Sequence, residues 1–148
     1  MSYINMKCPN CHKKIKIDKK YINNKLNCIY CGKEIILKEI REINTETYLD
    51  EVVRFDGAVI LNIYNDDCDN CKKLEETLKE INNEYNDLKI VKLNAKENMK
   101  LISGFMIRAV PTMILFIDGV QVDMRIGAVD KNAIQRWLSM YNMLPNIF

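Results

Sequence analysis

The chain has 148 residues, 48% of them hydrophobic, and a formal net charge of +2 at pH 7. This length allows one domain with its own hydrophobic core and a second module too small to be held together by burial alone. No stretch approaches the roughly 18 consecutive apolar residues of a membrane-spanning helix, and the lysine-punctuated start lacks the apolar middle of a signal peptide. The sequence therefore argues against a membrane protein, and we expect a cytoplasmic protein.

Four of the six cysteines form two Cys-x-x-Cys pairs near the start of the chain. Cys8 pairs with Cys11 and Cys28 with Cys31, and sixteen residues separate the inner cysteines. In the cytosol, where thiols are kept reduced, such cysteines are more plausible as metal ligands than as structural disulfides. The spacing is typical of a zinc ribbon, in which four thiolates surround one Zn²⁺. We therefore predict that residues 1–38 form a hairpin-rich module with a structural zinc ion, since the protein supplies all four ligands.

Other metal chemistry is possible in this segment. His12 directly follows Cys11 and is an alternative ligand, but four cysteines already complete the shell, so we expect His12 on the surface. An iron–sulfur cluster is the rival metal centre. Two disulfides or four free thiols are the alternatives without a metal.

The positive charge is concentrated in the first part of the chain. Residues 1–43 carry ten Lys and Arg against four Asp and Glu, whereas residues 44–148 carry twelve against sixteen. A basic segment can indicate nucleic-acid binding. Lysines on a solvated surface explain the excess of positive charge equally well, and four thiolates around one Zn²⁺ would lower the net charge of this segment. We therefore do not expect nucleic acid as a partner.

From residue 39 onward, strand and helix patterns alternate. The apolar run 58–64 is interrupted only by Asn62, as expected for a central strand buried on both faces. Asp130 is a suitable N-cap for the last helix. Alternating elements that end in a hairpin predict an α/β domain with a mixed sheet over residues 39–148. We expect strands at 58–64, 88–93, 112–117 and 120–126, and helices at 45–54, 71–85, 96–105 and 131–141. A first strand precedes them, and Ile36, Leu37, Ile40 and Ile43 lead into it.

The remaining two cysteines lie in the segment NIYNDDCDNCKKLEETL, where a buried strand leads into a helix. The apolar stripe of this helix includes Cys71 but not Cys68. We predict Cys68 at the first turn, where backbone N–H groups and the helix dipole favour a thiolate, and Cys71 one turn further in. Cys68 is then the nucleophile that attacks a substrate disulfide, and Cys71 resolves the mixed disulfide.

The Cys-x-x-Cys at a strand-to-helix turn, the segment RAVPTMILFIDGV, and the positions of Gly127 and Trp137 resemble the thioredoxin family. The resemblance covers most of residues 44–148 and implies the thioredoxin fold. It also implies a cis peptide between Val110 and Pro111 beside the cysteines, where this loop and Gly127 bind an extended substrate strand. With its ribbon, the whole chain is similar to bacterial thioredoxins that carry an N-terminal zinc-binding extension.

The acidic surroundings of Cys68 depart from the family pattern. Asp67 precedes it, and Asp69 and Asn70 follow it, where the family usually has tryptophan and a Gly-Pro dipeptide. Together with Asp66, these carboxylates either cap the helix and are solvated, which we favour, or raise the pKa of the nascent thiolate.

Asn62 is the second departure. It occupies the place where typical thioredoxins have a buried aspartate that relays a proton to the resolving cysteine, and asparagine cannot take a proton. Lys92 matches the family's lysine near that site, although a surface lysine at a strand end is an equally good interpretation. Unless Lys92 and water substitute, we expect Cys71 to react more slowly near neutral pH than in a standard thioredoxin.

These features predict a thiol/disulfide oxidoreductase that reduces protein disulfides through Cys68 and Cys71, whose disulfide is its redox cofactor. Pro111, Asn62 and Lys92 are the predicted supporting residues of the catalytic site. We expect a reductase as electron donor and a monomer in solution. Two alternatives remain open. One is a binding or chaperone-like adaptor with a weakly active cysteine pair. The other is an isomerase or oxidant, because the direction of thiol–disulfide exchange depends on small differences in thiolate stabilisation.

Overall fold

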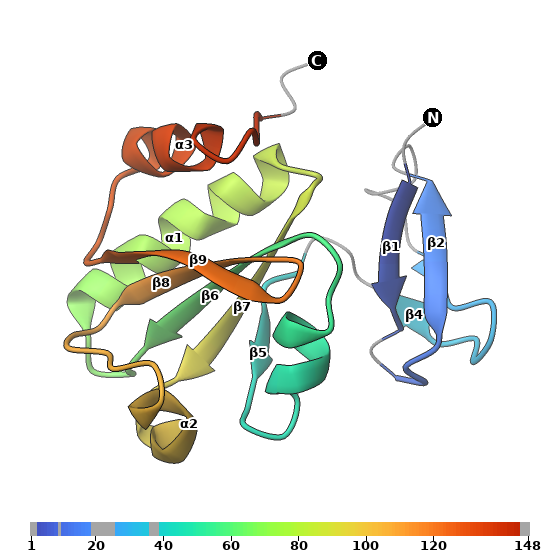
Figure 1. Ribbon diagram of the computed structural model, residues 1–148, viewed down its shortest axis with the longest axis horizontal. Helices are drawn as coiled ribbons and strands as arrows, with labels where there is room; N and C mark the ends of the chain where they lie inside the picture. Colours follow the sequence, from blue (N-terminus) through green and yellow to red (C-terminus); the bar gives the residue numbers. More distant parts are fainter. Residues whose placement is uncertain (1–2, 9, 19–25, 36–38, 146–148) are drawn as a thin grey trace. The chain divides into compact units, whose positions relative to one another are not determined.

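The computed structural model divides into two compact units, residues 1–39 and 40–148 (Figure 1). It describes residues 3–8, 10–18, 26–35 and 39–145. Ile36 and Leu37, which the sequence places just before the first strand of the second unit, lie outside these ranges. Within them, no helix has the length and apolar character needed to cross a membrane.

The N-terminal unit consists of two short antiparallel hairpins, as its alternating sequence predicts. One hairpin pairs β1 with β2 and the other pairs β3 with β4. The strands are β1 (Tyr3–Lys7), β2 (Lys14–Asp18), β3 (Leu26–Asn27) and β4 (Glu34–Ile35). Among the described side chains, the buried centre holds two isoleucines, Ile15 and Ile35, and two cysteines, Cys8 and Cys28. So small a core cannot offset the entropy of ordering the segment, and units of this size usually need a metal or disulfides.

The C-terminal unit is built on a five-stranded mixed sheet in the order β5-β7-β6-β8-β9 (Figure 1). Strands β5 and β6 run parallel to β7, while β8 is antiparallel to both β6 and β9. The strands are β5 (Arg41–Ile43), β6 (Ala58–Tyr64), β7 (Leu88–Asn94), β8 (Thr112–Ile117) and β9 (Val120–Ile126). Because β6 is central and covered on both faces, its first six residues are buried, which confirms the expectation from its apolar sequence.

Two hydrophobic cores lie on opposite faces of this sheet, and β6 contributes alternate residues to each. Ala58 and Ile60 pack with residues of the long helices α1 (Asp69–Glu84) and α3 (Lys131–Ser139). The intervening Val59, Leu61 and Ile63 pack with the short segments on the other face. Those segments are the π-helical turn η2 (Leu49–Val53), the 3-10 turn η3 (Lys96–Asn98) and α2 (Met99–Ser103).

The two helices predicted on this second face are shorter than their periodicity suggests. Over residues 45–54 the regular turn begins only at Leu49, because Asn44 accepts the backbone N–H of Thr47 and holds a separate turn. Over residues 96–105 the chain is divided at Asn98, whose side chain accepts the N–H of Thr45 at 2.9 Å. Side-chain to backbone bonds thus replace part of each helix.

Asp123 on β9 fastens the last helix to the sheet. Its Oδ2 accepts the indole N–H of Trp137 at 2.9 Å and the hydroxyl of Tyr141 at 2.8 Å. Burial alone would raise the pKa of Asp123, but these hydrogen bonds and the Arg125 guanidinium lower it to about 2. Trp137 is 2% exposed and belongs to the core between the sheet and the long helices.

We expect Asp123→Asn to lower the free energy of unfolding at neutral pH by about 1–2 kcal/mol, since two hydrogen bonds to a charged acceptor are weakened. The pKa of Asp123 is depressed in the folded state, so its stabilising effect is present above about pH 4 and is lost as the pH falls toward 2. Urea unfolding at several pH values, followed by circular dichroism, measures the difference. Asp67→Asn, at a carboxylate 92% exposed, is the control; a pH-independent difference for Asp123→Asn would contradict the expectation.

Candidate functional site

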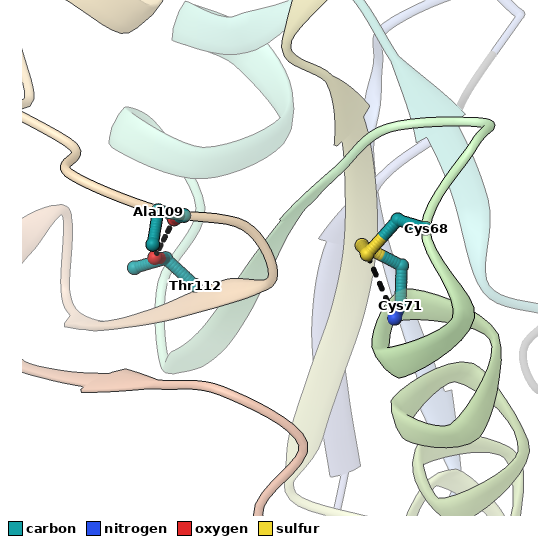
Figure 2. The surroundings of a disulfide bond; sticks show 4 residues. All are labelled: Cys68, Cys71, Ala109 and Thr112. Atoms are coloured by element: carbon teal, nitrogen blue, oxygen red, sulfur yellow. Dashed lines mark hydrogen bonds between the residues drawn. A yellow bond between two sulfur atoms is a disulfide. The ribbon is translucent and has the colours of Figure 1, made fainter.

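The end of β6 and the start of α1 position the redox cysteines. Cys68 is the N-cap of α1 in an extended conformation, and its Sγ accepts the backbone N–H of Cys71 at 3.0 Å (Figure 2). A disulfide joins the two residues, with a Cα–Cα distance of 5.1 Å. Cys71 is 4% exposed, whereas Cys68 is only half-buried. The arrangement presents one sulfur to the outside and keeps the other inside, as the apolar stripe predicts.

The side-chain atom that caps the start of α1 is not an aspartate oxygen, which we favoured from the sequence. It is the sulfur of Cys68, and none of the three nearby aspartates accepts the cap hydrogen bond. Asp66 instead accepts a hydrogen bond from Asn94 Nδ2 at 3.3 Å, and Asp67 is 92% exposed with Lys96 3.8 Å away. The helix begins at Asp69, two residues before Cys71, because the extended Cys68 already satisfies a terminal N–H.

The loop before β8 lies across from the disulfide in Figure 2. Its Val110-Pro111 peptide is cis, as the resemblance implies, and Pro111 is buried while Val110 is half-buried. Thr112 donates its hydroxyl hydrogen to the Ala109 carbonyl at 2.6 Å, and the N–H of Gly127 donates to the Pro111 carbonyl at 2.8 Å. Gly127 has φ +95°, a conformation that favours glycine. These bonds hold the proline loop against the end of β9.

Asn62 and Lys92 are register partners on β6 and β7. By strand alternation both lie on the face that α1 covers, together with Ile60. Asn62 is 3% exposed, and its Oδ1 has no hydrogen-bond partner among the described residues. The Nζ of Lys92 donates to Glu75 Oε1 on α1 at 3.0 Å, and its side chain is 24% exposed. Lys92 is therefore paired with α1 while part of its side chain stays exposed, and its role at the cysteines remains a prediction.

Sequence reasoning missed Glu75. The available signal was its spacing, four residues after Cys71 in a helix, which places the two side chains on neighbouring positions of one face. Its partner could not be read from the sequence, because Lys92 is seventeen residues away and reaches it only through the packing of α1 on β7.

The four ribbon cysteines form a candidate metal centre. Their sulfur atoms all lie within 4.8 Å of one another. The distance is 3.7 Å between Cys8 and Cys31 and also between Cys11 and Cys28. A tetrahedral zinc ion with Zn–S bonds of about 2.3 Å requires sulfurs about 3.8 Å apart, so the donor set fits this metal. None of the four forms a disulfide, which speaks against the alternative of two disulfides.

The two halves of this centre have the same backbone geometry. The N–H of Asn10 donates to Cys8 Sγ and that of Tyr30 donates to Cys28 Sγ, both at 3.4 Å. Such bonds stabilise thiolate: the Cys31 N–H and, to a smaller extent, the Tyr30 N–H lower the pKa of Cys28 to about 6 in spite of its burial.

The residue after the second cysteine of each pair lets the chain turn back. His12 and Gly32 occupy this position with φ of 63° and 76°. His12 is exposed and is not part of the sulfur cluster, so the structure supports its assignment to the surface.

Comparison with known proteins identifies the family. The thioredoxin family model matches residues 39–140. The thioredoxin of Rickettsia prowazekii is 33% identical over 101 residues, 68% of this chain and 96% of the relative. Thioredoxin 1 of a Nostoc species is 31% identical over 101 residues, 68% of this chain and 94% of the relative.

A solved structure gives the same result. A mutant thioredoxin from Halobacterium salinarum superposes with a TM-score of 0.65 at 31% identity and covers 70% of this chain and 91% of its own. The family-model match begins at residue 39, after the four-cysteine cluster, which fits a zinc ribbon. The chain therefore belongs to the thioredoxin family, and it is a thiol/disulfide oxidoreductase with a redox-active Cys-x-x-Cys disulfide.

Proposed function

We propose that this protein reduces disulfide bonds of other proteins, and that a reductase returns it to the dithiol form. The observation that carries the proposal is the unequal exposure of the two cysteines at the start of α1. Cys68 is accessible to a substrate disulfide, and Cys71 is protected until Cys68 has reacted. This asymmetry suits a two-step exchange better than a binding surface with a vestigial cysteine pair.

The chemistry follows from the N-cap geometry. In the reduced protein the Cys71 N–H and the α1 dipole favour the Cys68 thiolate, which attacks one sulfur of the substrate disulfide. One substrate thiolate leaves, and a mixed disulfide forms. Cys71 then attacks Cys68 Sγ, which restores the internal disulfide and releases the second substrate thiolate.

The proline loop supplies the proposed substrate-binding residues. The proposed mode is an extended peptide that lies along Val110, Pro111 and Gly127, where its backbone pairs with the loop. Ile126, which pairs with Thr112 at the end of β9, is 54% exposed, and Met106 before the loop is 84% exposed. These apolar side chains provide contacts without sequence specificity, which suits a reductase of many proteins.

We propose a zinc-binding module over residues 1–38 and a thioredoxin-like domain over residues 39–148. Cys8, Cys11, Cys28 and Cys31 would hold Zn²⁺, which supplies folding energy and no redox chemistry, because the protein fills all four coordination positions. The proposed place of action is the cytoplasm, where reductants keep ribbon thiols available for metal. The proposed working form is a monomer.

A redox titration tests the direction of the reaction. In glutathione buffers, the Cys68–Cys71 pair of the zinc-loaded protein should convert reversibly with a midpoint at or below about −230 mV, as for cellular reductants. Alkylation of free thiols and mass spectrometry identify the cysteines that change. A midpoint of about −120 to −180 mV would instead make the protein an oxidant or isomerase. A pair that never cycles, with partner capture that survives the Cys68→Ser, Cys71→Ser double substitution, would favour an adaptor.

The roles of the two cysteines have a separate test. After reduction of the zinc-loaded protein, iodoacetamide should modify Cys68 at least about tenfold faster than Cys71, because Cys68 is the more accessible of the two and lies at a helix N-terminus. Peptide mapping over time measures both rates. Cys68→Ser should leave a protein that reacts slowly, whereas Cys71→Ser should keep the fast reaction. Equal rates at both cysteines would contradict the assignment of nucleophile and resolver.

Metal analysis tests the ribbon. The purified full chain should contain one zinc per molecule, and Cys28→Ala should reduce the content to near zero because a tetrahedral site loses a ligand. His12→Ala is the matched control and should keep full zinc content, since His12 lies outside the sulfur cluster. Iron with inorganic sulfide in place of zinc would show that the rival cluster occupies the site.

A further inference from the structure

The resolving step requires a base near Cys71. A free thiol has a pKa of about 8.5 and burial raises it, yet only the thiolate attacks a disulfide. Cys71 is 4% exposed, so bulk water has little access to its proton. A side chain on the face of the sheet that α1 covers is therefore needed to remove the proton near neutral pH.

Asn62 is the polar side chain of β6 on that face, and it cannot serve as the base. Its amide oxygen accepts a hydrogen bond but does not take a proton in this pH range. Its Oδ1 is buried and has no partner among the described residues, so it is free to accept a hydrogen bond from a protonated group. Lys92, beside it on β7, supplies hydrogen-bond donors.

Glu75 is the carboxylate that lies about one helical turn after Cys71 in α1. Side chains four residues apart on a helix have Cβ atoms about 6 Å apart, so Glu75 is a helical neighbour of the resolving cysteine. Lys92 Nζ lies 3.0 Å from Glu75 Oε1 and fixes the carboxylate between α1 and β7. Lys92 is itself held over the ring of Tyr64, with its Nζ 5.5 Å from the ring centroid. The side chain of Lys92 is 24% exposed and that of Glu75 is 35% exposed, so both are partly shielded from solvent.

The other described carboxylates close in sequence to the cysteines are placed less well. Asp66 is engaged with Asn94, and Asp67 is directed to solvent near Lys96. Asp69 is exposed in the first turn of α1. Glu75 is the one of these four that contacts Lys92, the register partner of Asn62.

We propose that Glu75 is the general base of the resolving step and that Lys92 is the residue that positions it. Glu75 takes the proton from the Cys71 thiol, directly or through one water molecule. The Cys71 thiolate attacks Cys68 Sγ, the internal disulfide forms, the bond between Cys68 and the substrate sulfur breaks, and the substrate leaves as a thiolate. The inference rests on the proposed function, since it concerns the second half of that exchange.

The reaction of the reduced, zinc-loaded full chain with excess 5,5′-dithiobis(2-nitrobenzoate) isolates this step. Cys68 releases one coloured thiolate in a phase that depends on reagent concentration. Attack by Cys71 releases the second in a phase that does not. Stopped-flow measurement of the second phase at a series of pH values gives the pH profile of resolution.

Glu75→Gln should slow the second phase by about tenfold or more at neutral pH and leave it rising steadily with pH, as for an unassisted thiol. The first phase should be unchanged. Glu76→Gln is the matched control, because this adjacent carboxylate is 75% exposed and pairs with Lys79 on the outer side of α1. Asn62→Asp in the Glu75→Gln background should restore the fast second phase, since it returns a carboxylate to the same face.

The outcomes separate the inference from the function on which it rests. A second phase in Glu75→Gln with the rate and pH profile of the wild type overturns the role of Glu75 and leaves the reductase proposal intact. A wild-type protein that shows no second phase overturns both. If Glu76→Gln slows the second phase as much as Glu75→Gln does, the effect is one of general charge, and the assignment of Glu75 is overturned.

Discussion

The hydrogen bond from the Cys71 N–H to Cys68 Sγ is the interaction on which the redox site depends. It sets the start of α1, because the sulfur replaces the side-chain oxygen that usually accepts at an N-cap. It also places the accessible sulfur at the positive end of the helix dipole, where a thiolate is favoured. One contact therefore fixes both the helix boundary and the reactivity of the nucleophile, and nearby aspartates are left free for other partners.

The second constraint comes from β6, whose alternate residues serve two cores. A strand covered on both faces has no solvent-facing position for a polar side chain, so Asn62 must be accommodated inside the layer that α1 covers. Lys92, its register partner, solves the same problem by extending to Glu75. The long lysine side chain can reach a hydrogen-bond partner on the neighbouring helix, whereas the short asparagine side chain cannot. The carboxylate in this part of the structure therefore belongs to Glu75 of α1 and not to a residue of β6.

Much of the fold follows from sequence alone, and the exceptions have local causes. The bounds of β6, β8 and β9 are those predicted, because continuous apolar runs and an Asp-Gly turn leave little choice. Helix 45–54 is too long in the prediction because periodicity ignores the competing bond between Asn44 and Thr47.

The candidate site shows the same division between local and long-range signals. The spacing of Cys68 and Cys71 is a local signal, and the disulfide confirms that the two are paired. The contact between Lys92 and Glu75 depends on how a helix packs on a strand, which one sequence does not encode in a readable way. The sequence favours an aspartate as the cap of α1 because oxygen is the usual acceptor there, and only the extended conformation of Cys68 in the structure identifies sulfur as the acceptor.

The same Cys-x-x-Cys spacing serves two chemistries in this chain, and the backbone that follows the second cysteine separates them. In the ribbon, the N–H two residues after the first cysteine reaches its sulfur, and the next cysteine is followed by a positive φ at His12 or Gly32. The chain turns back, and four sulfurs converge. After Cys71, Lys72 instead continues α1, although the N–H after the second cysteine donates to the carbonyl of the first cysteine in all three pairs. The helix directs Cys71 inward and leaves Cys68 at the boundary, where one sulfur can meet a substrate.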